Sequence, residues 1–354
     1  MLELFRSVTR VIENRIGWSR IGTVTSLTLV ATAFIVLCTI LRDIGIDKVI
    51  AAMRATPLRA VIVASGLVLL GYYAITLYDY VALRALGWRE VPYATAAFAG
   101  FTAYAIGHGL GITLVTGGAV RLRIYSNWGL GLADVTKIGI ITGLTFWLGN
   151  ICALGLALAL TPSAAAAATQ LPSWANQVLG FIALGSVAGY IAWLVPAERI
   201  VGAAGLRIAL PNAAQTFVQI AIGILDLAVG SLATYALLPA APPTDYVVVA
   251  VAYVMATLFG FLSHAPGSLG VFEVAMLILL PQYQKEELLG SLLILHVLYF
   301  VLPLAVALLM LAVRETKLAR ARPLPRGIRS PPDLCSPNTP TGRPVYGDHG
   351  CTTS

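Results

Sequence analysis

The sequence has 354 residues, of which 58% are hydrophobic and only 11% are charged, and its mean hydropathy is +0.85. Soluble domains carry about 25% charged residues, so this composition excludes an ordinary water-soluble protein. The formal net charge is +7. Residues 314–354 hold seven Lys and Arg against three Asp and Glu, so a basic C-terminal segment supplies more than half of that charge.

In chain order, the first twenty residues are polar and contain four arginines. They lack the cleavage site of a signal peptide, so residues 1–20 are predicted to be a cytoplasmic segment and Ile21–Leu41 a retained first span. Residues 21–313 are predicted to form one transmembrane domain. Residues 314–354 are rich in proline and serine, which predicts a disordered, basic cytoplasmic tail.

A helix needs about 20 apolar residues to cross the hydrocarbon core of a bilayer. Six stretches meet this requirement: Ile21–Leu41, Ala60–Leu83, Ile138–Leu160, Trp174–Val195, Phe217–Leu238 and Leu288–Val313. Two further apolar stretches are interrupted. Tyr93–Val120 contains glycines at Gly107–Gly111 and Gly117–Gly118, and Tyr246–Leu280 contains a Ser263–Ser268 turn with proline and glycine. The uninterrupted piece of the first stretch, Tyr93–Ile106, would rise only about 21 Å as a helix, which is too short to cross the bilayer alone. The first stretch is therefore predicted to be a helix broken at its glycines.

Cytoplasmic loops of membrane proteins are enriched in Lys and Arg, and this rule orients the chain. The uncharged linkers Thr161–Ser173 and Pro239–Thr244 are predicted to be external, and both termini internal. If Tyr93–Val120 crossed once, Arg121 and Arg123 would lie outside, so this stretch is predicted to be a re-entrant hairpin from the cytoplasmic side. The same reasoning makes Tyr246–Leu280 a hairpin from the outside. Only the linker 42–59, with four cations, departs from the rule.

The predicted fold class is therefore an all-α polytopic membrane protein, with about six full transmembrane helices and two oppositely oriented re-entrant hairpins. Hydropathy alone counts this as eight spans. Broken segments in corresponding halves of a chain are typical of transporters built from inverted repeats, and they point to the substrate site. Non-helical backbone at membrane depth is tolerated where it is buried in protein or lines a cavity.

Ionisable side chains at bilayer depth are costly, which makes them candidates for function. Asp226 lies near the middle of its span, on one helical face with four small or polar residues, Gln219, Gly223, Gly230 and Thr234. Its alternative is a polar seam for helix packing. Asp79 lies near the end of its span. The alternative to a functional role is that its side chain extends to the membrane interface.

Arg121 and Arg123 follow Gly117 and Gly118, and a guanidinium can bind a lipid phosphate through two parallel hydrogen bonds. The glycines would let the backbone approach a headgroup. The alternative is that both arginines only set topology.

Glu273 follows the second break, either as a helix cap, as a partner for Arg121, or as a partner for a cationic headgroup. His108 and His264 lie in the two breaks, where they could change charge near neutral pH or hydrogen-bond a helix end. His296 and Tyr299, one turn apart, are predicted to serve packing and hydrogen bonding.

The sequence contains no hydrolase, zinc-protease or phosphate-loop motif, and its four cysteines lack metal-ligand spacing. We therefore expect no catalytic residues, metal or cofactor, and a protein that is not an enzyme. An intramembrane enzyme that uses Asp226, Glu273 and the histidines is the least favoured alternative.

Several ordered blocks resemble one family. Gly117–Tyr125 resembles its GGAxRxRxY signature, and Gly129–Ile138, Thr145–Gly149 and Pro266–Glu273 resemble later blocks. Together they are similar to the lysylphosphatidylglycerol synthase transmembrane family, which is the flippase-type membrane region of the bacterial multiple peptide resistance factor. The resemblance covers about Ile21 to Val313. One departure is Ser268, where the family usually has a second glycine.

The resemblance implies translocation of a phospholipid, including aminoacylated phosphatidylglycerol as a candidate, between leaflets of the bacterial inner membrane. The residues after Val313 are too few for the aminoacyltransferase domain of the two-part proteins. The alternative is a non-transporting accessory protein that supplies lipid to, or docks, a separate glycosyl- or aminoacyltransferase. The expected partners are membrane phospholipids and such an enzyme, without nucleic acid; an oligomer is compatible with the sequence.

Overall fold

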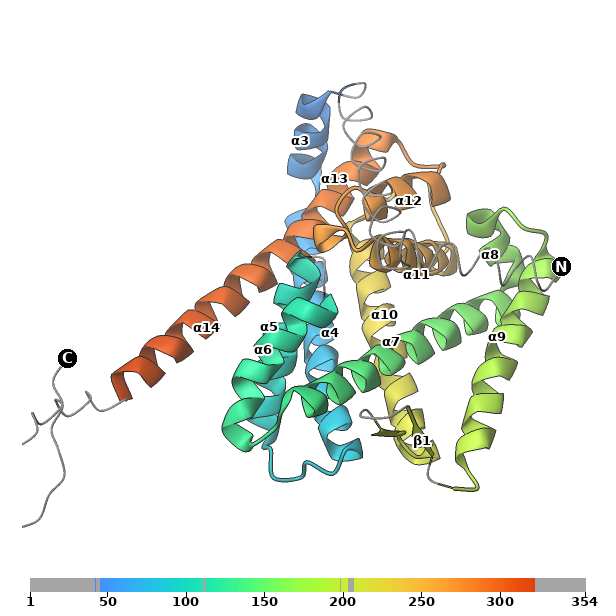
Figure 1. Cartoon of the computed structure of the whole chain (residues 1–354). Helices are drawn as coiled ribbons and strands as arrows, with labels where there is room; N and C mark the ends of the chain where they lie inside the picture. The colour runs from blue at the N-terminus through green and yellow to red at the C-terminus, as the bar shows by residue number, and fades with distance from the viewer. Residues whose placement is uncertain (1–41, 43–44, 111–112, 198, 203–206, 322–354) are drawn as a thin grey trace, which may run out of the picture. The chain divides into compact units, whose positions relative to one another are not determined.

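A computed structural model describes residue 42 and residues 45–110, 113–197, 199–202 and 207–321 (Figure 1). These residues are almost entirely helical, which confirms the predicted all-α class. The sheet in this part of the chain is one antiparallel pair, β1 (Ile200–Val201) and β2 (Ile208–Ala209), with Ile200 opposite Ala209. The described residues up to Leu311 form one compact unit and those from Ala312 to Ala321 belong to another, and the description below concerns the first.

The helices follow one another with short connections. Their bounds are α3 Ile46–Ala55, α4 Leu58–Ala85, α5 Tyr93–Leu110, α6 Thr113–Tyr125, α7 Leu132–Leu160, α8 Pro162–Thr169, α9 Ser173–Leu194, α10 Ala213–Leu237, α11 Tyr246–Ser263, α12 Val271–Leu279, α13 Lys285–His296 and α14 Leu302–Ala321. Short 3-10 turns form η1 (Ser126–Trp128) and η2 (Pro266–Ser268), and η3 (Val297–Val301) is a π-helical turn between α13 and α14.

Six helical stretches of the described residues are long and apolar enough to cross a membrane. Five correspond to predicted spans: α4, α7, α9, α10 and the Lys285–Lys317 stretch. The sixth is α11, which the distribution of Lys and Arg had assigned to half of a hairpin. The remaining predicted span, Ile21–Leu41, lies outside the described residues. The observed helices make the chain a polytopic membrane protein.

The first predicted hairpin consists of α5 and α6, which pack against each other. Helix α5 ends at Leu110 and α6 begins at Thr113, so the break lies at the end of the predicted Gly107–Gly111 stretch, whereas Gly117 and Gly118 lie inside α6 and are not part of a break. Gly109 and Gly117 serve close packing: a Cβ on Gly109 would lie 2.9 Å from Leu304, and one on Gly117 would lie 2.9 Å from the carbonyl oxygen of Ala103. Small residues at such contacts let membrane helices approach closely.

The second break lies where the sequence predicted it. Helix α11 ends at Ser263, His264 takes a left-handed conformation with φ of 55°, and η2 leads to α12. Gly267 and Gly270 have φ of 60° and 84°, which glycine adopts without strain. Ser268 has φ of 57°, a conformation that costs a serine free energy and that glycine adopts more readily. Helix α5 contacts η2, so the first hairpin reaches the break of the second (Figure 1).

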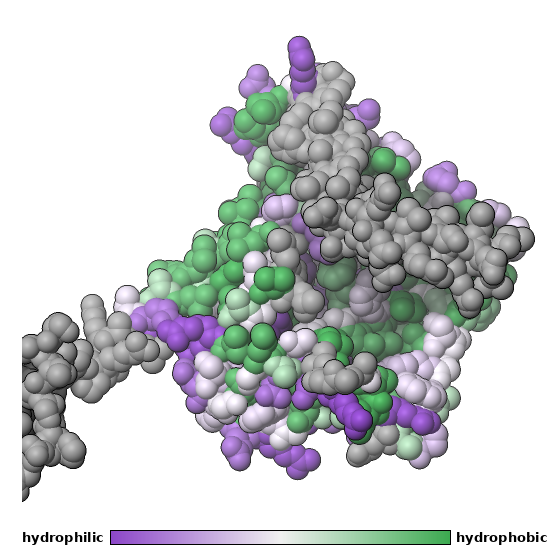
Figure 2. All heavy atoms as spheres, in the orientation of Figure 1, coloured by the Kyte–Doolittle hydropathy of each residue, from purple (hydrophilic) through white to green (hydrophobic). Residues whose placement is uncertain are grey.

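The charged loops predicted to be internal lie along one edge of this unit. In Figure 1 the α4–α5 connection, the α6–α7 connection and the β1–β2 pair lie together at its lower edge. Figure 2 shows hydrophilic residues gathered along that edge, with broad hydrophobic surface above it. The side of the membrane on which this edge lies stays a prediction.

Helix α10 is the most buried of the candidate spans and packs closely against both α4 and α7. Its crossing with α7 is made by two glycines: a Cβ on Gly149 would lie 2.5 Å from the Cα of Gly223. The predicted polar face of α10 is confirmed as buried, with Gln219 and Thr234 almost inaccessible. This crossing fixes α10, and therefore Asp226, at the centre of the bundle.

We predict that Gly149→Ala lowers stability by about 1–3 kcal/mol, because a methyl group at the crossing forces α7 and α10 apart. Gly143→Ala on the same helix is the matched control. A Cβ on Gly143 meets no atom within 4 Å, so this change should be neutral or stabilise by about 0.5–1 kcal/mol. Thermal unfolding of both variants in nanodiscs measures the difference; equal effects would contradict the assigned crossing.

Candidate functional site

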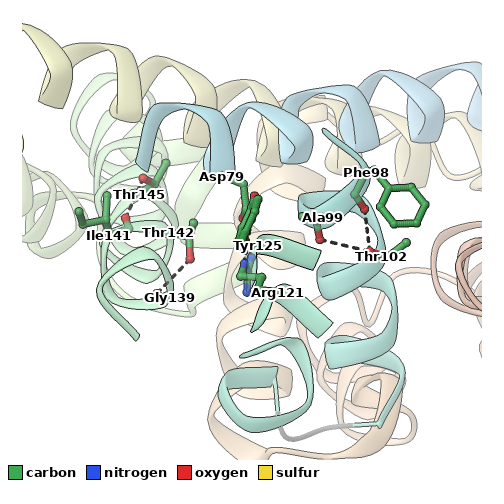
Figure 3. Close-up of polar contacts among 10 residues, drawn as sticks. All are labelled: Asp79, Phe98, Ala99, Thr102, Arg121, Tyr125, Gly139, Ile141, Thr142 and Thr145. Carbon is green, nitrogen blue, oxygen red and sulfur yellow. Dashed lines mark hydrogen bonds and ion pairs between the residues drawn. The ribbon is translucent and has the colours of Figure 1, made fainter. Parts of the chain in front are cut away.

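Helices α4 and α6 bring together a buried ion pair. In Arg121, Nε lies 3.0 and 2.9 Å from the two carboxylate oxygens of Asp79, and Nη2 lies 2.7 Å from Oδ1. The hydroxyl of Tyr125 donates to Oδ2 of Asp79 at 2.8 Å (Figure 3). Asp79 is fully buried and Arg121 is 8% exposed. The guanidinium and the carboxylate thus satisfy each other away from solvent.

This pair corrects two predictions. Asp79 does not reach out to the interface; it points inward, where Gly100 of α5 leaves room beside its Cβ. Glu273 is not the partner of Arg121, because Asp79 holds the guanidinium. Arg123 is exposed on the same helix and does not join the pair. Gly117 lies beside Arg121, with its Cβ position 3.4 Å from Nη1, whereas Gly118 faces open space.

Glu273 and His296 form a second polar cluster, between α12 and α13. Oε2 of Glu273 accepts the backbone N–H of Gly270 at 2.7 Å, which confirms the predicted cap at the start of a helix. Its Oε1 lies 3.0 Å from Nδ1 of His296, which makes an ion pair when the imidazole is protonated. Glu273 is fully buried. Both of its oxygens are therefore occupied within the protein.

Asp226 on α10 is the centre of a third cluster, made with tyrosines. Its Oδ2 accepts from the hydroxyl of Tyr78 at 3.2 Å, and its Oδ1 accepts from that of Tyr299 at 3.4 Å. The hydroxyl of Tyr104 lies 3.5 Å from that of Tyr299. Asp226 is 5% exposed. Among the described residues, no Lys or Arg forms an ion pair with it.

A cavity opens beside Asp226, between the two hairpins. Its walls come from both of them and from the central helices, with the lining residues Tyr104, His108, Phe146, Asp226, Leu227, Tyr253, Thr257, Phe261, Ser268, Phe272, Leu295, Tyr299 and Phe300. It has room for only about three water molecules. Aromatic rings form most of the wall and Asp226 is its one carboxylate. Neither Arg121 nor Glu273 lines it.

The two candidate histidines differ in position. His108 is helical rather than in a break, stacks on Tyr104 with ring centroids 3.9 Å apart, and lines the cavity. Its buried Nδ1 has no well-aligned hydrogen-bond partner among the described residues, although the backbone carbonyl of Tyr104 lies near it. His264 lies in the second break as predicted, but it is exposed, with Nδ1 3.0 Å from the carbonyl oxygen of Leu262. Only His108 of the two contributes to the cavity.

Sequence reasoning missed the tyrosines that complete these clusters. Tyr78 stands next to Asp79 and Tyr125 ends the GGAxRxRxY block, so both were visible without a role assigned. Tyr299 was predicted to be a hydrogen-bonding residue, which is confirmed, but its partner Asp226 lies 73 residues away. Among the described residues, no three His, Cys, Asp or Glu side chains gather closely enough to hold a metal ion.

Comparison with known proteins adds a membrane-protein context. No protein-family model matches the sequence. The uncharacterized protein slr0712 of Synechocystis sp. is 30% identical over 278 residues, which cover 78% of this chain and 85% of the relative. The inner membrane protein YbhN of Escherichia coli is 26% identical over 272 residues, which cover 74% of this chain and 82% of that protein. Together with the apolar helices, these similarities support a membrane location; the narrower resemblance to lysylphosphatidylglycerol synthases stays a prediction.

We predict that Arg121→Ala destabilises the protein by about 3–5 kcal/mol, because it leaves Asp79 buried without a counter-charge. The double change of Asp79→Asn with Arg121→Gln removes both charges and should cost much less. Thermal unfolding of the two proteins in the same nanodiscs gives the comparison. A double variant as unstable as Arg121→Ala would show that the pair is not the source of the loss.

Proposed function

The chain belongs to the same family as the uncharacterized slr0712 of Synechocystis, and we propose, from its polar interior and its resemblance to the lysylphosphatidylglycerol synthase transmembrane family, that it moves a phospholipid between the leaflets of the bacterial inner membrane. The observation that supports this most is the cavity beside Asp226, which residues of both hairpins and of their neighbouring spans enclose. Irregular backbone at membrane depth is typical of transporter sites. An acidic group on an aromatic wall suits a polar headgroup, while acyl chains remain in the bilayer.

Arg121 is the residue proposed to bind the lipid phosphate. Its Nε and Nη2 groups hold Asp79 through the same two-pronged geometry that a guanidinium uses for phosphate. In this account Asp79 is a resting partner that a headgroup phosphate replaces. Asp79 would then keep the hydrogen bond that it accepts from the hydroxyl of Tyr125.

The cavity is too small for a headgroup in this conformation, so transport requires the hairpin tips to separate. Helix α5 and η2 touch at the cavity, and Ser268 in η2 is part of its wall. The left-handed conformations at His264, Gly267 and Ser268 make this turn a plausible hinge, because hinges are a few residues that absorb large backbone changes. The cavity then opens to one side as the hairpins part.

The finer assignments follow the sequence. We propose that both termini are cytoplasmic, as the basic loops indicate, that the protein is not an enzyme, and that it uses no cofactor. Aminoacylated phosphatidylglycerol is the first lipid to test, because the resemblance names that class. These proposals rest on charge distribution and on ordered motifs, and each is open to direct measurement.

The test is translocation of fluorescent phospholipids in reconstituted vesicles, followed by chemical quenching of the outer leaflet. Vesicles with the protein should exchange label faster than protein-free vesicles. Arg121→Lys keeps a charge for Asp79 but loses the two-pronged geometry, so we expect a rate about tenfold lower, equivalent to about 1.4 kcal/mol. Arg89→Lys, at an exposed arginine in the α4–α5 connection, is the control and should match the wild type.

Phosphatidylglycerol, its lysyl ester and phosphatidylethanolamine are compared as substrates. Equal rates with and without protein for all three lipids would overturn the proposal. If a lipid-modifying enzyme then co-purifies stably with the protein, the accessory role takes its place. Equal rates for wild type and Arg121→Lys would leave transport standing but remove Arg121 from the phosphate site.

A further inference from the structure

The three buried carboxylates of the described membrane domain differ in what balances their charge. Asp79 has the guanidinium of Arg121, and Glu273 has the imidazole of His296 and the N–H of Gly270. Asp226 has only tyrosine hydroxyls as hydrogen-bond donors. A buried carboxylate without a counter-charge is costly at bilayer depth. Asp226 is thus the one of the three that has no cationic partner among the residues that the structure describes.

The hydrogen bonds to Asp226 are also long. Its oxygens lie 3.2 and 3.4 Å from the hydroxyls of Tyr78 and Tyr299, whereas hydroxyl–oxygen bonds are typically about 2.7–2.8 Å. A hydroxyl can donate to a carboxylate or accept from a carboxylic acid, so the same partners suit both protonation states. Asp226 can therefore gain or lose a proton without any partner having to leave.

The titratable groups that face Asp226 come from four of the elements packed around it. They are Tyr72 and Tyr78 of α4, Tyr104 and His108 of α5, Tyr253 of α11 and Tyr299 of η3. Helix α7 contributes Phe146, which carries no charge. Arg121 is held by Asp79. Among the described residues that line the cavity, Asp226 supplies the carboxylate and His108 the imidazole, and the other ionisable groups are tyrosine hydroxyls.

The cavity gives Asp226 a route to water. Asp226 is part of its wall, and the space accommodates a few water molecules, which can carry a proton between the carboxyl group and the outside when the hairpins part. The π-helical turn η3 places Tyr299 against Asp226, and such turns are frequent at functional sites. The carboxyl group of Asp226 is therefore buried in the protein and yet accessible to water in the cavity.

We propose that Asp226 is a proton-binding site whose loading is coupled to lipid movement. This inference rests on the proposed translocation. A cationic group of the lipid headgroup that enters the cavity competes with the proton for the carboxylate of Asp226. Lipid entry therefore releases the proton into the cavity water. A proton gradient across the membrane then drives the lipid in one direction. Tyr78 and Tyr299 are positioning residues, since they act through Asp226.

Proton binding is tested first without transport. Infrared difference spectra of the protein in vesicles, recorded over a pH range of about 5 to 9, report the C=O band of a buried carboxylic acid. The proposal predicts a band that appears on acidification, is kept in Glu273→Gln and is absent in Asp226→Asn. A wild-type protein without this band, or an Asp226→Asn protein that keeps it, would overturn the proposal. Thermal unfolding confirms that each variant is folded.

Coupling is then tested in the lipid translocation assay with an imposed pH gradient. The wild-type rate should change by about fivefold or more with the direction of the gradient, the lower end of typical coupling between sites. Asp226→Asn should respond to neither direction. Lipid movement that ignores the gradient, or that follows a sodium gradient instead, would overturn the coupling. Failure to move lipid at all would refute the proposed function, while the infrared band would still decide whether Asp226 binds a proton.

Discussion

A carboxylate inside a bilayer must find its hydrogen-bond donors within the protein, and this constraint organises the interior of the molecule. Three helices carry such a buried group, and each group is satisfied differently: Asp79 by a guanidinium, Glu273 by an imidazole and a helix N-terminus, and Asp226 by tyrosine hydroxyls. Burying an ion pair does little for net stability, because desolvation offsets the attraction. Its presence therefore points to function more than to folding.

The three clusters are joined through shared helices. Tyr78 and Asp79 are neighbours on α4, so one helix contacts both Asp226 and Arg121. His296 and Tyr299 are one turn apart, at the α13–η3 junction, and contact Glu273 and Asp226. A movement of either helix displaces partners in two clusters at once. This arrangement couples the hairpin that carries Arg121 to the break that carries Glu273, with Asp226 and the cavity between them.

Hydropathy located the membrane helices well, because about 20 apolar residues have few alternatives to a membrane-buried helix. It also found the break at Ser263–Ser268, where proline ends the helix and positive φ values require glycine-like residues. It also assigned Gly117 and Gly118 wrongly to the first break, because glycine composition cannot distinguish a chain reversal from a close helix contact. Gly117 illustrates this: it is helical, and its missing side chain makes room for the backbone of Ala103.

The site was only partly predictable. Asp226 and Arg121 were identified from the cost of charge at bilayer depth, and the cap by Glu273 from its position after a turn. The pairing of Arg121 with Asp79 was missed because the two are 42 residues apart and nothing local links them. The tyrosines were missed because a neutral side chain does not stand out in an apolar span. Partner choice is a property of the packed helices rather than of any one segment.

The central claim is that a headgroup enters the cavity when α5 and the Pro266–Ser268 turn separate. It is tested by introducing one cysteine in the last turn of α5 and one in η2, after replacing Cys38, Cys152, Cys335 and Cys351. The measurement is the rate of lipid translocation before and after the disulfide is reduced. The account predicts that the cross-linked protein does not move lipid and that reduction restores the rate. An unchanged rate in the fully cross-linked protein would contradict it.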